Sequence, residues 1–355
     1  MKMQSNSDED WGQDASWEDA RLLTQTMHIS VEHVMRLISS GSLDLTPDYL
    51  RSHRWDIKRQ SRLIESLLLN IPVPPIYLAE ESRGQYVIID GYQRLTAVYR
   101  YLNNEFRLRS LDVLPGLRNR SFDELGPEFR TALEMQLITV VTIPRQASSL
   151  MRYEVFLRLN TGGKPLSVQQ LRSAAFPGPL NDALIGLSQD EFLWVQLKAS
   201  ARRDMADVAY VLRFLFMARM EDLWTHPTQR MLDQFMATHA YDSPDEIDSY
   251  RECFQRAIRA CEAIWGEHAF KRFRYPRWLD RVVAEIYDVQ MIACHISSDE
   301  VLAKARGKNA LASEKMARLL DAPPFSDRHG PTSRGFEATH AIRVVQELLR
   351  ELAAE

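Results

Sequence analysis

Cysteine is scarce in this sequence, and its spacing excludes two common uses of the residue. Only three of the 355 residues are cysteine, namely Cys253, Cys261 and Cys294. No two of them stand at the short spacing typical of a zinc site, and an odd number of widely spaced cysteines does not form a disulfide framework. The cysteines therefore favour a protein of the reducing cytoplasm.

Long apolar segments and targeting signals are missing as well. The longest apolar run, Val208–Met220, is interrupted by Arg213 and is too short to span a bilayer. The first residues are acidic and polar, which is unlike the start of a signal peptide. We therefore expect a cytoplasmic protein that has no membrane partner.

Negative charge is concentrated at one end of the chain. Residues 1–20 contain one lysine and six acidic residues, a sum of −5, whereas the whole chain carries −4. Because this end also has few aliphatic residues, residues 1–25 are predicted to be a disordered acidic tail. The remainder is nearly neutral, so net charge neither requires nor excludes a nucleic-acid partner.

The periodicity of apolar residues divides the rest of the chain into two regions. Residues 26–178 mix strand and helix patterns, which predicts an α+β domain, and residues 179–355 have helical periodicity almost throughout, which predicts an all-α domain. The predicted strands of the first region cover residues 76–79, 85–89, 106–109 and 137–143, and the predicted helices cover residues 30–39, 57–70, 92–102 and 149–159, with a further helix starting near 122.

The strongest chemical pattern is a predicted strand, turn and helix over residues 86–96. Gly91 permits a sharp turn, and the first turn of the helix presents free N–H groups that suit an anion. Arg94 adds a fork of donors for a phosphate, and Gln93 could orient a water molecule. Asp90 could hold a divalent cation. The plainer alternative is that Asp90 caps the helix and Arg94 forms a surface ion pair.

This segment resembles the N-terminal domain family of GmrSD restriction enzymes. The family motif is Asp-Gly-Gln-Gln-Arg, and residues 90–94 read Asp-Gly-Tyr-Gln-Arg. Further blocks resemble the family in the same order, at residues 47–51, 54–56, 63–68, 71–76 and 160–167. The resemblance covers about residues 28–176. It implies a ParB/sulfiredoxin-like fold, nucleotide binding and, in some members, triphosphate hydrolysis coupled to nuclease action on foreign or modified DNA.

The resemblance also implies roles for individual residues. The implied catalytic residues are Asp90, Gln93 and Arg94, and the implied nucleotide-binding residues are Arg51, Arg54, Gly91, Tyr92, Asn160, Thr161, Gly162 and Lys164. The implied cofactor is a ribonucleoside triphosphate with Mg²⁺. Two positions depart from the family: Tyr92 replaces the first Gln of the motif, and Leu50 stands where Gln is usual before Arg51. If the missing Gln positions the attacking water, binding without hydrolysis is the expected result.

Two basic clusters contain aromatic residues. Trp55 lies within the first, which consists of Arg51, His53, Arg54, Lys58, Arg59 and Arg62. This cluster either contacts a phosphate or forms a solvated helix face. The second cluster consists of Lys271, Arg272, Arg274 and Arg277, interleaved with Phe273, Tyr275 and Trp278. Its composition suits nucleic-acid binding, although a loop that packs domains together has the same character.

The leading hypothesis is a nucleotide-binding and NTP-hydrolysing protein of an anti-phage or restriction-type system, acting with DNA or a partner nuclease. One alternative is a non-catalytic module that neutralises or scaffolds a toxic partner protein encoded nearby. A second alternative is a metal-dependent nuclease that uses the ParB-like domain. The sequence contains no His-Glu-x-x-His motif and assigns no metal ligands. It leaves homo-oligomer formation open.

Overall fold

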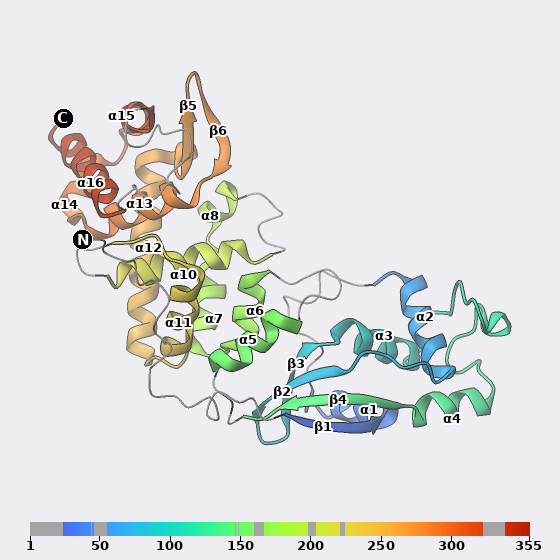
Figure 1. Cartoon of the computed structure of the whole chain (residues 1–355). Coiled ribbons are helices and arrows are strands. Elements are labelled where there is room, and N and C mark those ends of the chain that lie inside the picture. The colour runs from blue at the N-terminus through green and yellow to red at the C-terminus, as the bar shows by residue number, and fades with distance from the viewer. Residues whose placement is uncertain are drawn as a thin grey trace, which may run out of the picture. The chain divides into compact units, whose positions relative to one another are not determined.

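The computed structural model describes residues 24–43, 45, 55–145, 147, 149–159, 167–197, 204–220, 224–321 and 338–355. Contacts between residues divide the chain into two compact units, Met1–Pro165 and Leu166–Glu355, called unit 1 and unit 2 below (Figure 1). The predicted acidic tail lies outside the described residues except for its last two positions, and Gln25 already belongs to a strand.

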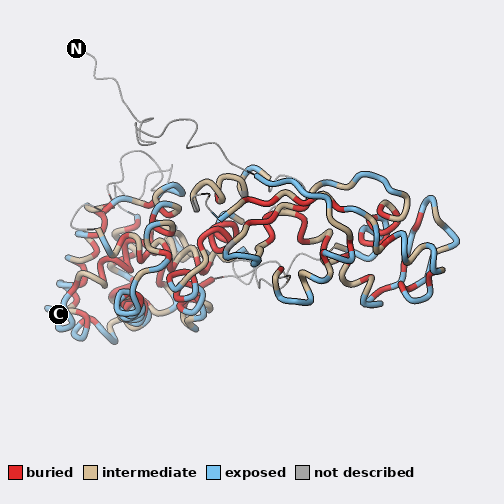
Figure 2. The backbone as a smooth tube through the Cα atoms, turned by 90° about the horizontal axis from the view of Figure 1, so that it is seen from below, coloured by how far each residue is buried: buried red, intermediate tan, exposed pale blue. Residues whose placement is uncertain are grey.

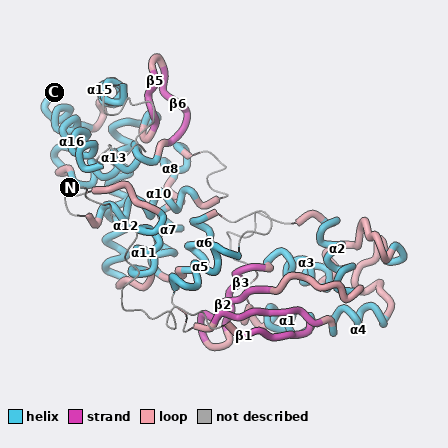
Figure 3. Tube along the Cα trace, in the orientation of Figure 1, coloured by secondary structure: helices cyan, strands magenta, loops and turns pink. Residues whose placement is uncertain are grey.

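Unit 1 contains a four-stranded sheet. Its strands are β1 (Gln25–Ser30), β2 (Ile76–Ser82), β3 (Gln85–Asp90) and β4 (Leu137–Ile143), in the order β1-β4-β2-β3. The pairs β1–β4 and β2–β3 are antiparallel, and β2 runs parallel to β4. Figure 3 shows the four strands side by side in magenta. As a result β3 is an edge strand, and its carboxyl end leads directly into the next helix.

The helices of unit 1 begin at the caps that the sequence provides. They are α1 (Val31–Ser39), α2 (Ile57–Leu68), α3 (Tyr92–Leu102), α4 (Pro127–Met135) and α5 (Ser149–Leu159), with a 3-10 turn η2 at Pro115–Leu117. The hydroxyl of Ser30 accepts the N–H of His33, and the carboxylate of Asp56 accepts the N–H of Arg59. Helix α2 packs on α3, which brings its first turns close to the end of β3.

Two expected elements of unit 1 are not formed. Residues 106–109 were predicted to be a strand, but their backbone bonds to neighbouring loops: Leu108 exchanges hydrogen bonds with residues 119 and 120. A helix was predicted near residue 122, but the first helix after this point begins at Pro127. The apolar side chains are buried as expected, because a loop folded over a core buries alternate residues just as a strand does.

Unit 2 consists mostly of helices. They are α6 (Val168–Ala175), α7 (Pro179–Leu187), α8 (Glu191–Gln196), α10 (Ala206–Ala218), α11 (Gln229–His239), α12 (Pro244–Trp265), α13 (Ala284–Ile296), α14 (Asp299–Ala305), α15 (Asn309–Asp321) and α16 (Ala338–Ala354), with a 3-10 turn η3 at Gly266–His268. Helix α13 packs against α10, α12 and α16. Every residue from Ile286 to Cys294 is buried, which makes α13 the central helix of this unit. Figure 2 colours the described backbone by burial, with the buried segments in red.

The expectation that the second region is all-α is wrong in one place. Strands β5 (Lys271–Arg274) and β6 (Arg277–Val282) form an antiparallel hairpin between α12 and α13 (Figure 1). The hairpin contains the second basic cluster of the sequence, so these residues lie on paired strands and not in an irregular loop.

Along the chain, unit 1 ends at Pro165, which is earlier than the boundary that we placed after residue 178. Helix α6 belongs to unit 2, because the buried guanidinium of Arg172 bonds the carboxylate of Asp233 at 2.6 Å and the main chain of Gln229 at 3.1 Å. In the part of the chain that the structure describes, no helix is both long and apolar enough to cross a membrane.

Candidate nucleotide site

The turn between β3 and α3 is as sharp as the sequence predicts. Strand β3 ends at Asp90, and Gly91 follows as the residue before the helix with φ of 100°. The N–H of Leu95 donates to the carbonyl of Gly91 and closes the first helical turn. A Cβ atom on Gly91 would lie 2.4 Å from Cδ1 of Ile76 and 3.2 Å from the guanidinium of Arg94. Both the backbone angle and the close packing therefore require glycine here.

Replacing Gly91 with alanine is expected to destabilise unit 1 by about 1–3 kcal/mol, because the backbone angle is strained and the new methyl group must displace Ile76. Gly84→Ala is the matched control: its φ of 79° is also positive, but nothing lies within 4 Å of its Cβ position. Thermal unfolding followed by circular dichroism compares the two variants. Equal losses in both would show that the close approach to Ile76 is unimportant.

Asp90 and Arg94 form an ion pair across one turn of α3. Nη2 of Arg94 lies 2.7 Å from Oδ2 of Asp90 and also donates to the carbonyl of Pro75 at 3.0 Å. The side chains are only 35% and 13% exposed, and Nε of Arg94 is buried with no hydrogen-bond partner in the part of the chain that the structure describes. The alternative in which Asp90 caps the helix is wrong, since Gly91 occupies that position and no side chain caps the helix.

Gln93 makes a contact that the sequence did not predict. Its side-chain oxygen accepts the backbone N–H of Trp55 at 3.0 Å, and Nε2 of Gln60 donates to the backbone carbonyl of Trp55 at 2.6 Å. Two amide side chains, one from α3 and one from α2, thus hold the backbone of Trp55. The guanidinium of Arg59 lies over the Trp55 ring at 4.2 Å from its centroid.

These contacts surround a cavity of about 420 Å³ beside the turn. It is lined by Trp55, Arg59, Arg62, Leu63, Ser66, Pro74, Asp90 and Arg94. Three guanidinium groups face one carboxylate, so the cavity carries positive charge, and an indole ring supplies an aromatic wall. Arg94 is paired with Asp90 and Arg62 with Asp112, whereas Arg59 has no carboxylate partner among the described residues. An anion with a planar aromatic part fits this combination.

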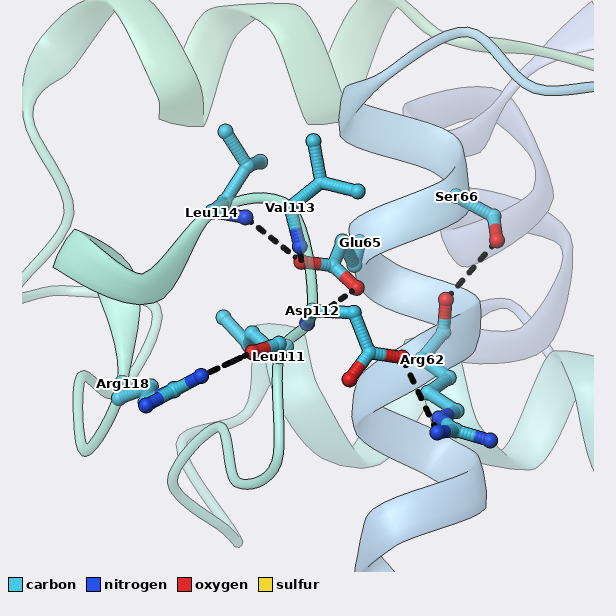
Figure 4. Close-up of polar contacts among 8 residues, drawn as sticks. All are labelled: Arg62, Glu65, Ser66, Leu111, Asp112, Val113, Leu114 and Arg118. Atoms are coloured by element: carbon cyan, nitrogen blue, oxygen red, sulfur yellow. Dashed lines mark hydrogen bonds and ion pairs between the residues drawn. The ribbon is translucent and has the colours of Figure 1, made fainter.

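The wall formed by α2 is anchored by its buried residue Glu65 (Figure 4). Its carboxylate accepts three consecutive backbone N–H groups, from residues 112, 113 and 114, at 3.2, 2.8 and 2.8 Å. Burial acts to raise the pKa of Glu65, but these donors outweigh it and hold the pKa below its ordinary value. One turn earlier, the hydroxyl of Ser61 accepts the N–H of Arg109 at 2.9 Å. These contacts fix the helix that presents Arg59 and Arg62.

The predicted site residues divide into three groups. Asp90 and Arg94 line the cavity, whereas Gly91, Tyr92 and Gln93 shape the turn beside it; Tyr92 is buried, with 8% of its surface exposed. Six others lie outside the described residues, namely Arg51, Arg54, Asn160, Thr161, Gly162 and Lys164. The last group, Lys271, Arg272, Arg274 and Arg277, lies on the β5–β6 hairpin of unit 2.

Trp55, Arg59 and Arg62 belong to the first basic cluster of the sequence, but we did not place them in the site. The available signal was the spacing of Trp55 and Arg59, four residues apart at the start of a helix, which favours stacking of the guanidinium on the ring. In the described part of the chain, no group of three or more His, Cys, Asp or Glu residues could hold a metal ion.

The fold and the cavity define an α+β domain with a basic pocket at a strand–turn–helix junction. The family model of the GmrSD restriction endonuclease N-terminal domain matches residues 31–177. Residues 31–177 therefore form a domain of that family. The searches of curated proteins and of solved structures found no match.

Proposed function

We propose that unit 1 binds a ribonucleoside triphosphate in the cavity beside the Asp90–Gly91 turn. The observation that carries this proposal is the lining itself: Trp55 and three arginines surround a space of about 420 Å³, within the range of small-ligand sites. The Trp55 ring offers a surface for the base, and the guanidinium groups offer charged donors for the phosphates.

Arg59 is the lining arginine best placed to bind a phosphate, because it has no carboxylate partner among the described residues. Its stacking on Trp55 holds the guanidinium beside the aromatic wall. Arg94 sets the shape of the turn, since it bonds both Asp90 and the carbonyl of Pro75. Asp90 supplies one carboxylate, and Mg²⁺ commonly binds through one or two carboxylates together with substrate phosphates. In this proposal any Mg²⁺ therefore arrives with the triphosphate.

Arg59→Ala is expected to weaken triphosphate binding about 10-fold or more, because a hydrogen bond to a charged group contributes about 1.5–3 kcal/mol. Lys58→Ala is the matched control: it removes an exposed cation from the same helix, and Lys58 does not line the cavity. Calorimetric titration with each of the four ribonucleoside triphosphates, with and without Mg²⁺ and DNA, measures the affinities. If the wild-type protein binds none of them, or if both variants bind alike, the proposed site is wrong.

A second candidate function is binding without hydrolysis, as in a module that holds a partner protein. Two observations favour it. Tyr92 replaces the first glutamine of the family motif and is buried, and the side-chain oxygen of Gln93 is engaged by Trp55. Tyr92 therefore offers no amide to position water, and the amide oxygen of Gln93 is already engaged. Phosphate release under single-turnover conditions separates the two candidates, and release at a rate above that of protein-free solution would favour the hydrolase.

We further propose that unit 2 contacts the DNA on which a restriction-type system acts, through the exposed arginines of the β5–β6 hairpin. Arg274 and Arg277 are opposite each other at the end of the hairpin, and both are exposed. Paired guanidinium groups on a protruding hairpin suit contacts to successive phosphates. The partner nuclease and the cytoplasmic location remain parts of the same proposal.

A further inference from the structure

A second cavity, of about 670 Å³, lies in unit 2 against the β5–β6 hairpin. Its walls come from the hairpin, from α15 and from the junction of α12 with the turn η3. Four of its residues have aromatic rings, namely Trp265, His268, Phe273 and Trp278. This is a larger aromatic surface than the one around Trp55 in unit 1, and the proposed triphosphate site does not use it.

The rings are arranged to present one continuous aromatic wall. Phe273 and Trp278 are register partners on the two strands, with ring centroids 5.3 Å apart and an angle of 65° between their planes. The ring of His268 stacks on Trp278 at 4.7 Å and 20°, and its Nδ1 lies 3.1 Å from the hydroxyl of Ser313. Packing and this hydrogen bond therefore hold the wall in place before any ligand arrives.

Trp265 forms the base of the cavity from the protein interior. It is 1% exposed, and its Nε1 is buried without a hydrogen-bond partner among the described residues. Because this N–H group has almost no accessible surface, Trp265 supports the aromatic wall by packing and does not itself bond a ligand.

The hairpin separates two kinds of side chain. Side chains of adjacent residues in a strand point to opposite faces, so the pair Arg274–Arg277 lies on the face opposite to the pair Phe273–Trp278. Arg281, further along β6, is exposed as well. One face of the hairpin is thus aromatic and lines the cavity, whereas the other is basic and open to solvent.

The charges around the cavity decide what enters it. Glu267 and Glu314 lie at its edge and are 85% and 56% exposed, so a phosphate would be repelled from the interior. Carboxylates accept hydrogen bonds from the exocyclic amino groups of bases. A cationic ligand would suit the rings and carboxylates, but the exposed arginines on the other face of the same hairpin would oppose its approach.

We propose that this cavity receives a single unpaired or extruded base of the DNA, while the basic face of the hairpin holds the flanking phosphates. This inference rests on the proposed DNA contact of unit 2 and adds the part of the DNA that the protein reads. An aromatic wall binds a base only when the base is out of the stack. The protein therefore prefers DNA that offers such a base over a fully paired duplex.

The test uses the full chain and two fluorescein-labelled duplexes of equal length, one fully paired and one with a single unpaired base, with binding followed by anisotropy. The wild-type protein is expected to bind the second duplex about 10-fold more tightly, within the range that stacking of one base gives. Trp278→Ala is expected to abolish this preference. Tyr241→Ala, which removes an exposed ring elsewhere in unit 2, is the matched control.

The outcomes distinguish the base pocket from the proposed DNA contact on which it rests. If Arg274→Ala and Arg277→Ala weaken both duplexes while the wild-type preference is absent, the DNA contact stands and the base pocket is wrong. If the wild-type protein binds neither duplex, the DNA contact itself fails, and the pocket with it. A preference that survives in Trp278→Ala also overturns the pocket. Circular dichroism of each variant verifies folding, and Trp278→Phe replaces Trp278→Ala if the latter does not fold.

Discussion

Asp288→Ala is expected to lower the free energy of unfolding of unit 2 by about 3–5 kcal/mol, the loss typical of breaking a buried ion pair from one side. Asp288 is fully buried on the central helix α13. Its carboxylate accepts Nε of Arg213 at 3.1 Å and a second nitrogen of the same guanidinium, and it contacts Nδ1 of His226 at 3.0 Å.

The loss is large because the substitution leaves a mostly buried cation behind. The side chain of Arg213 is 18% exposed. Burial acts to lower the pKa of Arg213, and the carboxylate of Asp288 outweighs this and raises it. Without Asp288 the guanidinium keeps its charge, since arginine does not deprotonate in proteins, but it has lost its counterion in a place that water hardly reaches.

Chemical denaturation at neutral pH measures the effect, with Arg213→Met and the double variant completing a mutant cycle. The double variant is expected to be more stable than the sum of the single losses predicts, because neither charge is then left alone. Asp248→Ala on α12 is the control, since Asp248 is 65% exposed and its ion pair with Arg251 contributes little. Losses that simply add in the double variant would contradict a coupled buried pair.

The elements that the sequence predicts well are those with local signals. Ser167 and Gln170 form the expected capping box at the start of α6, and each side chain bonds the other residue's backbone N–H. The buried strand β4 follows from its run of β-branched apolar residues, and the turn before β3 follows from Gly84. In each case the residues that decide the structure stand within a few positions of one another.

The elements that we missed depend on distant partners. Strand β1 is mostly exposed, and its only apolar residues are Met27 and Ile29. This pattern is too short to predict a strand, and its pairing with β4 is what identifies it as one. The β5–β6 hairpin is built from basic and aromatic residues around Tyr275-Pro276, which lacks the Asn-Gly or Asp-Gly pattern of common hairpin turns. Its pairing is therefore visible only once the two strands are placed side by side.

The same distinction holds for the candidate site. The bond between Asp90 and Arg94 joins residues one helical turn apart; the sequence suggested an ion pair for Arg94 as one alternative, without naming Asp90 as its partner. The bond between Gln93 and Trp55 joins residues that are 38 positions apart. No local pattern shows that this amide holds the backbone of Trp55, so a role in orienting water was predicted in its place.

Glu65→Ala is expected to destabilise unit 1 by about 3 kcal/mol at neutral pH. The substitution removes the carboxylate that accepts the backbone N–H groups of residues 112–114 (Figure 4). Hydrogen exchange followed by mass spectrometry locates the effect: the amides of Val113 and Leu114 are expected to exchange faster in the variant. Glu32→Gln, in an exposed ion pair on α1, is the control for loss of a carboxylate.

The Glu65 contribution also depends on pH in a definite direction. The pKa of Glu65 is lowered in the folded protein, so the stabilisation is complete above the ordinary glutamate pKa of about 4.3 and is lost as the pH falls through the lower folded value. Urea unfolding of the wild-type protein at pH 7 and pH 4 should therefore differ more than that of Glu65→Gln, which keeps one acceptor oxygen but cannot titrate. Equal pH dependence in the two proteins would mean that the carboxylate is not what holds the loop to α2, and the support for the wall carrying Arg59 and Arg62 would have to come from elsewhere.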